Sequence, residues 1–142
     1  MMKKKFIGAL IFAVSLVLVV GTALAYTGTY TLSTIAYMVY LDTQHSYLPD
    51  TNGRINVSYN LKTYYNMSDT EPVTDTPQNP KVAARSGGTT VTIMSLGTGV
   101  SWNSSKTLQG LNTSTYYGIR FSNTTQTRYI KGSGVVSANG QS

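Results

Sequence analysis

The chain of 142 residues contains no cysteine and a single histidine, His45. Without cysteine there is no disulfide, no thiolate nucleophile and no cysteine-based zinc site. One histidine also excludes metal sites built from two histidines and the His-Glu-x-x-His motif. A Ser-His-Asp triad would have to use His45, with Asp42 three residues away, and no Gly-x-Ser-x-Gly elbow accompanies it. We therefore expect no enzyme and no cofactor.

Acidic residues are few, and the second half of the chain has none. Residues 26–75 hold two basic and five acidic residues, a net charge of −3, whereas residues 76–142 hold six basic residues and no acid, a net charge of +6. A chain with this asymmetry can present an acidic side and a basic side. The alternative is that folding interleaves the halves and gives a mixed surface.

Long apolar runs are scarce as well, and the one that occurs is near the start. Three consecutive lysines at 3–5 precede an apolar run at 6–20, and Ala-Leu-Ala follows at 23–25. This order is typical of a secretory signal peptide, and the run is shorter than the ~20 residues that span a bilayer. We predict that residues 1–25 form a signal-peptide helix and that residues 26–142 are secreted and extracellular; a retained N-terminal anchor is the alternative.

Helical periodicity is nearly absent from residues 26–142, and strand signals recur instead. Residues 54–65 alternate apolar and polar side chains, which predicts a strand with one face in a core. Residues 30–41 predict a second strand with a bulge near Ser33-Thr34 and an apolar part at 35–41 that is covered on both faces. Further strands are expected at 82–85, 89–96, 99–102, 106–108, 116–122 and 129–137.

Two connecting segments carry distinct signals. Asn52-Gly53 favours a turn, so a hairpin or meander is predicted between strands 30–41 and 54–65. Residues 66–81 contain three prolines and three of the five acids, which predicts a long, Pro-rich acidic loop or linker. Its acids could offer oxygen ligands to calcium, but no Asp-x-Asp-x-Asp-Gly motif is present, and a solvated loop is the preferred interpretation.

Seven or eight short strands at this spacing predict one all-β domain over residues 26–142, an antiparallel β-sandwich or small barrel. Residues 110–121 read Gly-Leu-Asn-Thr-Ser-Thr-Tyr-Tyr-Gly-Ile-Arg-Phe. They resemble the E–F corner of fibronectin type III and immunoglobulin-like sandwiches, which commonly read Gly-Leu-x-Pro-Gly-Thr-x-Tyr. Leu111, Thr115 and Tyr117 match that spacing. Thr-Ser replaces Pro-Gly, and the early tryptophan of fibronectin type III is missing.

The resemblance implies an immunoglobulin-like sandwich with a structural corner. In that corner Leu111 fills the core and the Tyr117 hydroxyl hydrogen-bonds to nearby backbone. Residues 132–137 are in addition similar to the last strand of small secreted proteins of Gram-positive bacteria. Neither resemblance carries a catalytic residue.

The leading interpretation is a secreted, non-enzymatic β-sandwich that binds an anionic cell-envelope polymer or carbohydrate through its basic C-terminal half. No nucleic-acid partner is expected, and membrane contact is expected only through the signal peptide. One alternative is a self-assembling structural subunit, a homo-oligomer that pairs through the apolar strand at 35–41; another is a bacteriocin-like toxin. The candidate binding residues are Lys106, Arg120, Arg128, Lys131 and, as an aromatic platform, Trp102.

Overall fold

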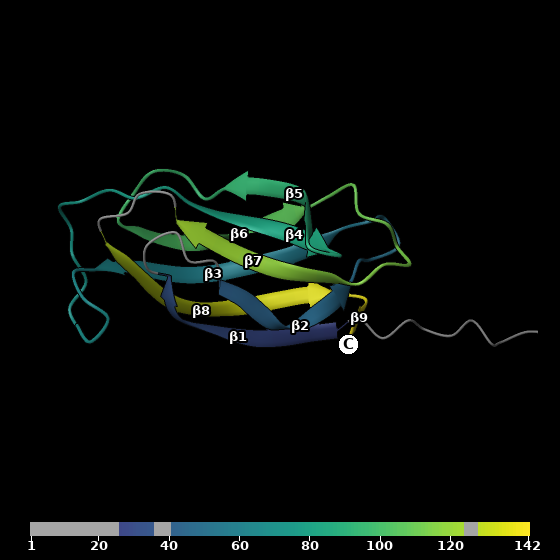
Figure 1. Cartoon of the computed structure of the whole chain (residues 1–142), viewed down its shortest axis with the longest axis horizontal. Helices are drawn as coiled ribbons and strands as arrows, with labels where there is room; N and C mark the ends of the chain where they lie inside the picture. The colour runs from purple at the N-terminus through teal and green to yellow at the C-terminus, as the bar shows by residue number, and fades with distance from the viewer. Residues whose placement is uncertain (1–25, 36–40, 124–127) are drawn as a thin grey trace, which may run out of the picture.

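The computed structural model describes residues 26–35, 41–123 and 128–142 (Figure 1). The predicted signal peptide and most of the apolar stretch at 35–41 lie outside these residues. Within the described ranges, no helix has the length and apolar character that crossing a bilayer requires.

The described strands form two antiparallel sheets that pack face to face, so the predicted sandwich is confirmed (Figure 1). Sheet A has four strands in the order β1 (Tyr26–Ile35), β8 (Tyr129–Ala138), β3 (Ile55–Tyr64) and β6 (Ser101–Leu108). Sheet B has five strands in the order β5 (Thr89–Ser95), β4 (Pro80–Ser86), β7 (Tyr117–Asn123), β2 (Leu41–Leu48) and β9 (Gly140–Gln141).

The strands pair in a nested pattern: β1 with β8, β2 with β7, β3 with β6 and β4 with β5. Nested pairing of eight strands in two sheets is the arrangement of a jelly roll. An immunoglobulin-type sandwich instead keeps its first and second strands in one sheet. Because β1 and β2 lie in different sheets here, the resemblance to that family is local to the corner and does not extend to the strand order.

The core lies between the two sheets and follows the alternation of the sequence. In β3, Ile55, Val57 and Leu61 are fully buried, as the period of two predicts. From sheet B, Ile119 and Phe121 meet them, also fully buried. Burying a side chain of this size contributes about 1.5–3 kcal/mol, so the facing rows of the two sheets hold the layers together.

The predicted strand at 30–41 is two strands in different sheets, β1 and β2. The register of β1 shifts between Leu32 and Ile35, where a bulge was expected. The predicted hairpin is wrong, because the turn before β3 carries the chain from sheet B to sheet A. Gly53 makes this crossing possible, since its φ is +69° and an added Cβ would lie 2.4 Å from the Leu111 carbonyl oxygen.

Three further expectations change. The predicted strands at 99–102 and 106–108 are one strand, β6, because polar residues that resemble a turn are tolerated on an exposed edge strand. The acidic loop ends at residue 79, since Pro80 begins β4, a position where its missing donor is tolerated. The strand that was expected to end at residue 41 continues as β2 to Leu48, and Tyr47 near its end is only 2% exposed and pairs with Tyr117.

Candidate functional site

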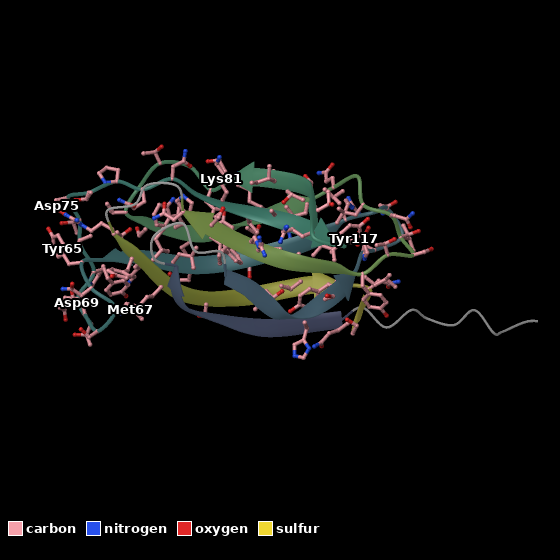
Figure 2. All side chains as sticks on the ribbon, viewed as in Figure 1. Tyr65, Met67, Asp69, Asp75, Lys81 and Tyr117 are labelled. Carbon is pink, nitrogen blue, oxygen red and sulfur yellow. The ribbon has the colours of Figure 1, made fainter. Side chains whose placement is uncertain are left out.

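Lys131, one of the predicted polymer-binding residues, holds the acidic loop of residues 65–79. Its Nζ donates to the carbonyl oxygens of Met67, at 3.1 Å, and of Asp69. The same ammonium lies 4.0 Å from the centre of the Tyr64 ring. Figure 2 shows Met67 and Asp69 on this loop at one end of the sandwich. The charge of Lys131 is therefore engaged within the chain.

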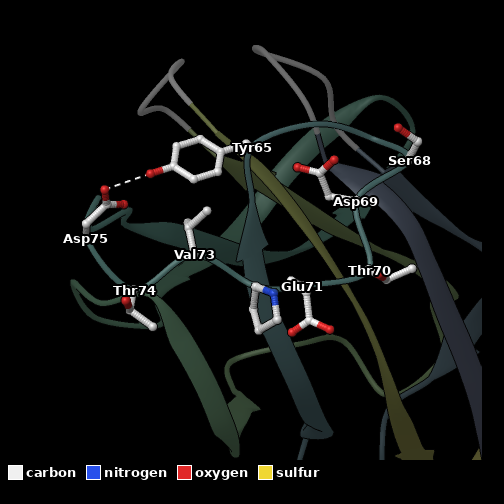
Figure 3. A pocket seen from close by; sticks show the side chains of 9 residues that line it. Tyr65, Ser68, Asp69, Thr70, Glu71, Val73, Thr74 and Asp75 are labelled. Carbon is white, nitrogen blue, oxygen red and sulfur yellow. Dashed lines mark hydrogen bonds between the residues drawn. The ribbon is translucent and has the colours of Figure 1, made fainter.

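Arg128 anchors the same loop further along. Its guanidinium lies 4.3 Å from the centre of the Tyr65 ring, and its Nη2 donates to Thr76 Oγ1 at 3.1 Å. The Tyr65 hydroxyl donates to Asp75 Oδ2 at 2.7 Å (Figure 3). This bond raises the pKa of Tyr65 and lowers the pKa of Asp75. At this end the acidic and basic halves interleave, as the mixed-surface alternative requires.

The loop encloses a hollow of about 570 Å³ lined by Tyr65 and residues 68–75 (Figure 3). Its rim carries Asp69, Glu71 and Asp75. In the part of the chain that the structure describes, no three His, Cys, Asp or Glu side chains gather in a way that could hold a metal ion. The geometry therefore gives no support to a calcium site.

Trp102 and Lys106 lie on β6, in sheet A. Trp102 is 7% exposed, pairs with Leu61, and its indole N–H donates to the Gly97 carbonyl at 2.8 Å. This burial leaves little of the ring at the surface, so the geometry gives no support to an aromatic binding platform at Trp102. Lys106 is half-buried and pairs with Val57.

Two cations that sequence reasoning missed, Lys81 and Arg85, share the outer face of sheet B. Val82 and Ala84, which alternate with them along β4, are fully buried against sheet A. Alternation therefore turns Lys81 and Arg85 to the opposite face. Residues 81–85 read Lys-Val-Ala-Ala-Arg, and this order already indicates that a strand would place both cations on one face.

Arg120 joins this face from the neighbouring strand β7, because the residues on either side of it, Ile119 and Phe121, are buried in the core. Its Cα pairs with that of Ala83, midway between Lys81 and Arg85. With ~3.3 Å per residue along a strand and ~4.8 Å between strands, the three Cα atoms form a triangle with sides of about 8, 8 and 13 Å. We call Lys81, Arg85 and Arg120 the basic face. Their fields add, because these separations are comparable to the Debye length of ~8 Å in physiological salt.

Local contacts and the distribution of acids define the basic face further. Arg85 Nε donates to Thr90 Oγ1 at 3.2 Å and its Nη2 donates to the Gly88 carbonyl, which orients the guanidinium. Of the five acids, three lie in the loop at 65–79 and one in the turn before β3; Figure 2 shows Lys81 well away from two of the loop acids. The fifth, Asp42, pairs with Arg120 in the register, and its side chain is not among those described.

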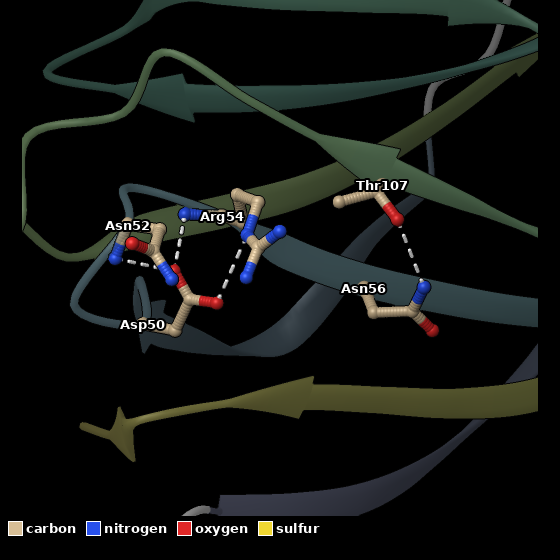
Figure 4. A network of polar contacts seen from close by, with 5 residues as sticks. All are labelled: Asp50, Asn52, Arg54, Asn56 and Thr107. Carbon is tan, nitrogen blue, oxygen red and sulfur yellow. Dashed lines mark hydrogen bonds and ion pairs between the residues drawn. The ribbon is translucent and has the colours of Figure 1, made fainter.

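The outer face of sheet A is different, because it is polar and largely uncharged. Asn56 Nδ2 donates to Thr107 Oγ1 at 3.1 Å on this face (Figure 4). The only cations on the outer-facing positions of β3 and β8 are Lys62 and Lys131, near the end that carries the acidic loop. The other outer-facing residues of β3, β6 and β8 are Asn56, Ser58, Asn60, Ser101, Asn103, Ser105, Thr107, Ser133, Val135, Ser137 and, beside the acidic loop, Tyr64 and Tyr129.

The turn before β3 is closed by the carboxylate of Asp50 (Figure 4). Oδ1 accepts hydrogen bonds from the backbone N–H groups of Asn52, at 2.8 Å, and Arg54, at 2.9 Å, and Oδ2 pairs with Arg54 Nε at 3.2 Å. Slight desolvation raises the pKa of Asp50, but these bonds outweigh it and lower the pKa below its ordinary value of 3.8. The adjoining hollow of about 300 Å³ is thus bordered by a structural turn.

The corner predicted from the sequence has a defined geometry. Leu111 is buried, and the Tyr117 hydroxyl accepts a hydrogen bond from the backbone N–H of Asn112 at 3.0 Å. Thr115 is half-buried and its N–H donates to the Asn112 carbonyl at 3.2 Å. The corner stabilises the crossing from β6 to β7 and carries no chemical group of a site.

Comparison with known proteins gives no family for this chain. No family model matches it, and no curated protein matches it. Among solved structures it is similar to the infectious bursal disease virus VP2 subviral particle, with 15% identity, a TM-score of 0.46, and coverage of 80% of this chain and 32% of that chain. The chain therefore spans about a third of that protein. It is also similar to a subunit of Bacillus endospore appendages, described as disulfide-linked pili, with 15% identity, a TM-score of 0.33, and coverage of 80% and 83%. These similarities assign the chain neither a family nor a function.

Proposed function

We propose that this protein is a non-enzymatic binding module that holds a linear anionic polymer on the basic face of sheet B. The observation that supports the proposal is the convergence of Lys81, Arg85 and Arg120 from two adjacent strands onto one sheet surface. Polymers with repeating phosphate or carboxylate groups complement such a surface. The planar guanidinium of arginine can donate two parallel hydrogen bonds to their oxygen atoms, and the ammonium group of lysine provides a compact positive charge.

The proposal revises the set of contact residues. Of the four cations expected from the sequence, Arg120 belongs to the basic face, whereas Arg128 and Lys131 hold the acidic loop and Lys106 lies in the other sheet. Lys81 and Arg85 take their place. Together with the predicted signal peptide, this set favours a polymer of the cell envelope as the partner. A toxin would, in contrast, inhibit the growth of neighbouring strains.

The test measures binding of the protein, recovered from culture after expression of the full chain, to long-chain polyphosphate and to polygalacturonate. For nucleic-acid polyanions the logarithm of affinity falls by about 0.7–0.9 per neutralised charge for each tenfold rise in salt. Three contacts therefore predict a slope of about −2 to −3. The double variant K81Q/R85Q should bind at least tenfold more weakly and lose most of this slope.

The matched control is K62Q/K106Q, which removes the same charge from other parts of the surface. It should keep most of the affinity and the slope. Equal losses in the two double variants, or binding that does not change with salt, would contradict the proposal. Binding to vesicles that contain phosphatidylglycerol, without binding to either soluble polymer, would assign the face to a membrane surface and overturn the polymer.

A further inference from the structure

The strand β5 forms an edge of sheet B and pairs only with β4 in the part of the chain that the structure describes. The Leu96 N–H donates to the Pro80 carbonyl at 2.9 Å, which fixes the phase of the hydrogen bonds between the two strands. Antiparallel pairs alternate between bonded and non-bonded. Thr92 and Met94 therefore bond to β4, and the N–H and C=O of Ile93 point away from it, toward the open edge.

The composition of β5 does nothing to protect this edge. Natural edge strands are commonly blunted by lysine or proline, yet residues 89–95 contain no charge and no proline. Val91 and Ile93 are 48% and 53% exposed, although both are β-branched apolar residues. The register shift opposite Arg85 places an extra residue on β5 at Val91, so Thr92 to Ser95 remain regularly paired and form the straight part of the edge.

We propose that β5 pairs antiparallel with β5 of a second copy of this chain, across a two-fold axis at Ile93. The strand is complementary to itself in this register. The two Ile93 residues face each other as a hydrogen-bonded pair, which satisfies the outward N–H and C=O of both. Their side chains cover each other on the outer face, and Thr92 of each copy lies opposite Met94 of the other. The two five-stranded sheets become one continuous sheet.

Charge does not oppose this pairing. The nearest cations, Lys81 and Arg85, lie on β4, one strand in from the edge. In the dimer three strand spacings separate the two copies of β4, about 14 Å at ~4.8 Å per spacing. That distance exceeds the Debye length of ~8 Å at physiological salt, so repulsion between the cations is largely screened.

The pairing has a consequence for the proposed polymer site, although it does not depend on that site. The two basic faces come to lie on the same side of the joined sheet, and six cations then face one polymer. Two linked sites raise the apparent affinity through effective concentration without any new contact. The dimer should therefore bind a polymer with higher apparent affinity than the monomer, which has only three cations on its basic face.

Cross-linking provides a direct test, because the native chain has no cysteine. Ile93→Cys introduces one thiol per chain. In the proposed register the two Cα atoms lie about 5.5 Å apart, within the ~4.4–6.8 Å that a disulfide spans. The matched control is Asn103→Cys, exposed on β6 at the edge of the other sheet. With no polyanion present, I93C should form covalent dimers at least ten times faster than N103C under mild oxidation.

A second measurement uses the cysteine-free protein. Sedimentation equilibrium should show a monomer–dimer equilibrium, and I93K should raise its dissociation constant at least tenfold while N103K leaves it within about twofold. Three results would overturn the proposal: equal cross-linking rates, a native chain that stays monomeric near 1 mM, or a dimer that I93K does not weaken, which would place the contact at another edge such as β1 or β6. None of them removes polymer binding by the monomer, so the two proposals fail separately.

Discussion

Replacing Gly132 by alanine should destabilise the fold far more than the same change at Gly118. Both glycines lie inside strands with a neighbouring strand on each side. An added Cβ at Gly132 would lie 2.0 Å from the Asn60 carbonyl oxygen and 2.9 Å from the Leu61 Cα. At Gly118 the nearest atom is the Arg85 carbonyl oxygen at 4.0 Å, an ordinary contact.

The clash at Gly132 involves backbone, so β8 and β3 must move apart to relieve it. Overpacking a well-packed site costs about 1–3 kcal/mol, and here we expect about 3 kcal/mol or more. At Gly118 alanine should be neutral or stabilise by up to about 1 kcal/mol, because it reduces the entropy of the unfolded chain. For a domain of this size about 3 kcal/mol lowers Tm by roughly 10 °C. Urea unfolding of both variants measures the difference, and equal stabilities would refute the packing described for β8.

Three further results are expected. Tyr117→Phe removes the acceptor of the corner and should cost about 1–3 kcal/mol in urea unfolding, whereas Tyr116→Phe, on an exposed side chain, should stay within about 0.5 kcal/mol. Because the folded pKa of Asp50 lies below its ordinary value of 3.8, its contribution is present above about pH 4 and is lost as the pH falls through the folded pKa; the stability gap between the native chain and D50N should therefore be clear at pH 6 and shrink as the pH falls below about 4. Lys131→Met should speed proteolysis of the loop at 65–79 without changing the rest of the fold, and an unchanged cleavage rate would contradict its anchoring role.

Local alternation accounts for the parts of the fold that the sequence predicted. In β3 and β7, one residue in two is apolar, and the period of a strand places those residues in the core. In β7, Ile119 and Phe121 are fully buried and Arg120 between them points to the outer face, as this period requires. The corner at Tyr117 was likewise predicted from the spacing of residues within one short segment.

The strand order could not be predicted, because the partners are far apart in the chain. β1 pairs with β8, so that Tyr26 lies opposite Ala138, and no local signal links them. A turn signal such as Asn52-Gly53 shows that the chain reverses but not that it changes sheet. Strand β6 is divided into two expected strands, 99–102 and 106–108, because the polar composition of an exposed edge is similar to that of a turn.

The candidate site depends on the same long-range pairing. Lys81 and Arg85 meet Arg120 only through the register between β4 and β7, which joins segments almost 40 residues apart. Arg128 and Lys131, in contrast, were expected on a binding surface, but both contact the acidic loop. The residues next to them in the sequence give no indication of that contact. The basic second half of the chain therefore predicted the sign of the charge on the candidate binding surface, but not the position of that surface in the fold.

The most direct test of the account maps where a polyanion touches the protein. In an NMR titration of the ¹⁵N-labelled chain with polyphosphate, the largest amide shifts should fall on the outer rows of β4 and β7, at Ala83, Arg120 and Ser122. Shifts that instead centre on Asn60 and Asn103, on the outer face of sheet A, would contradict the placement of the binding surface on sheet B.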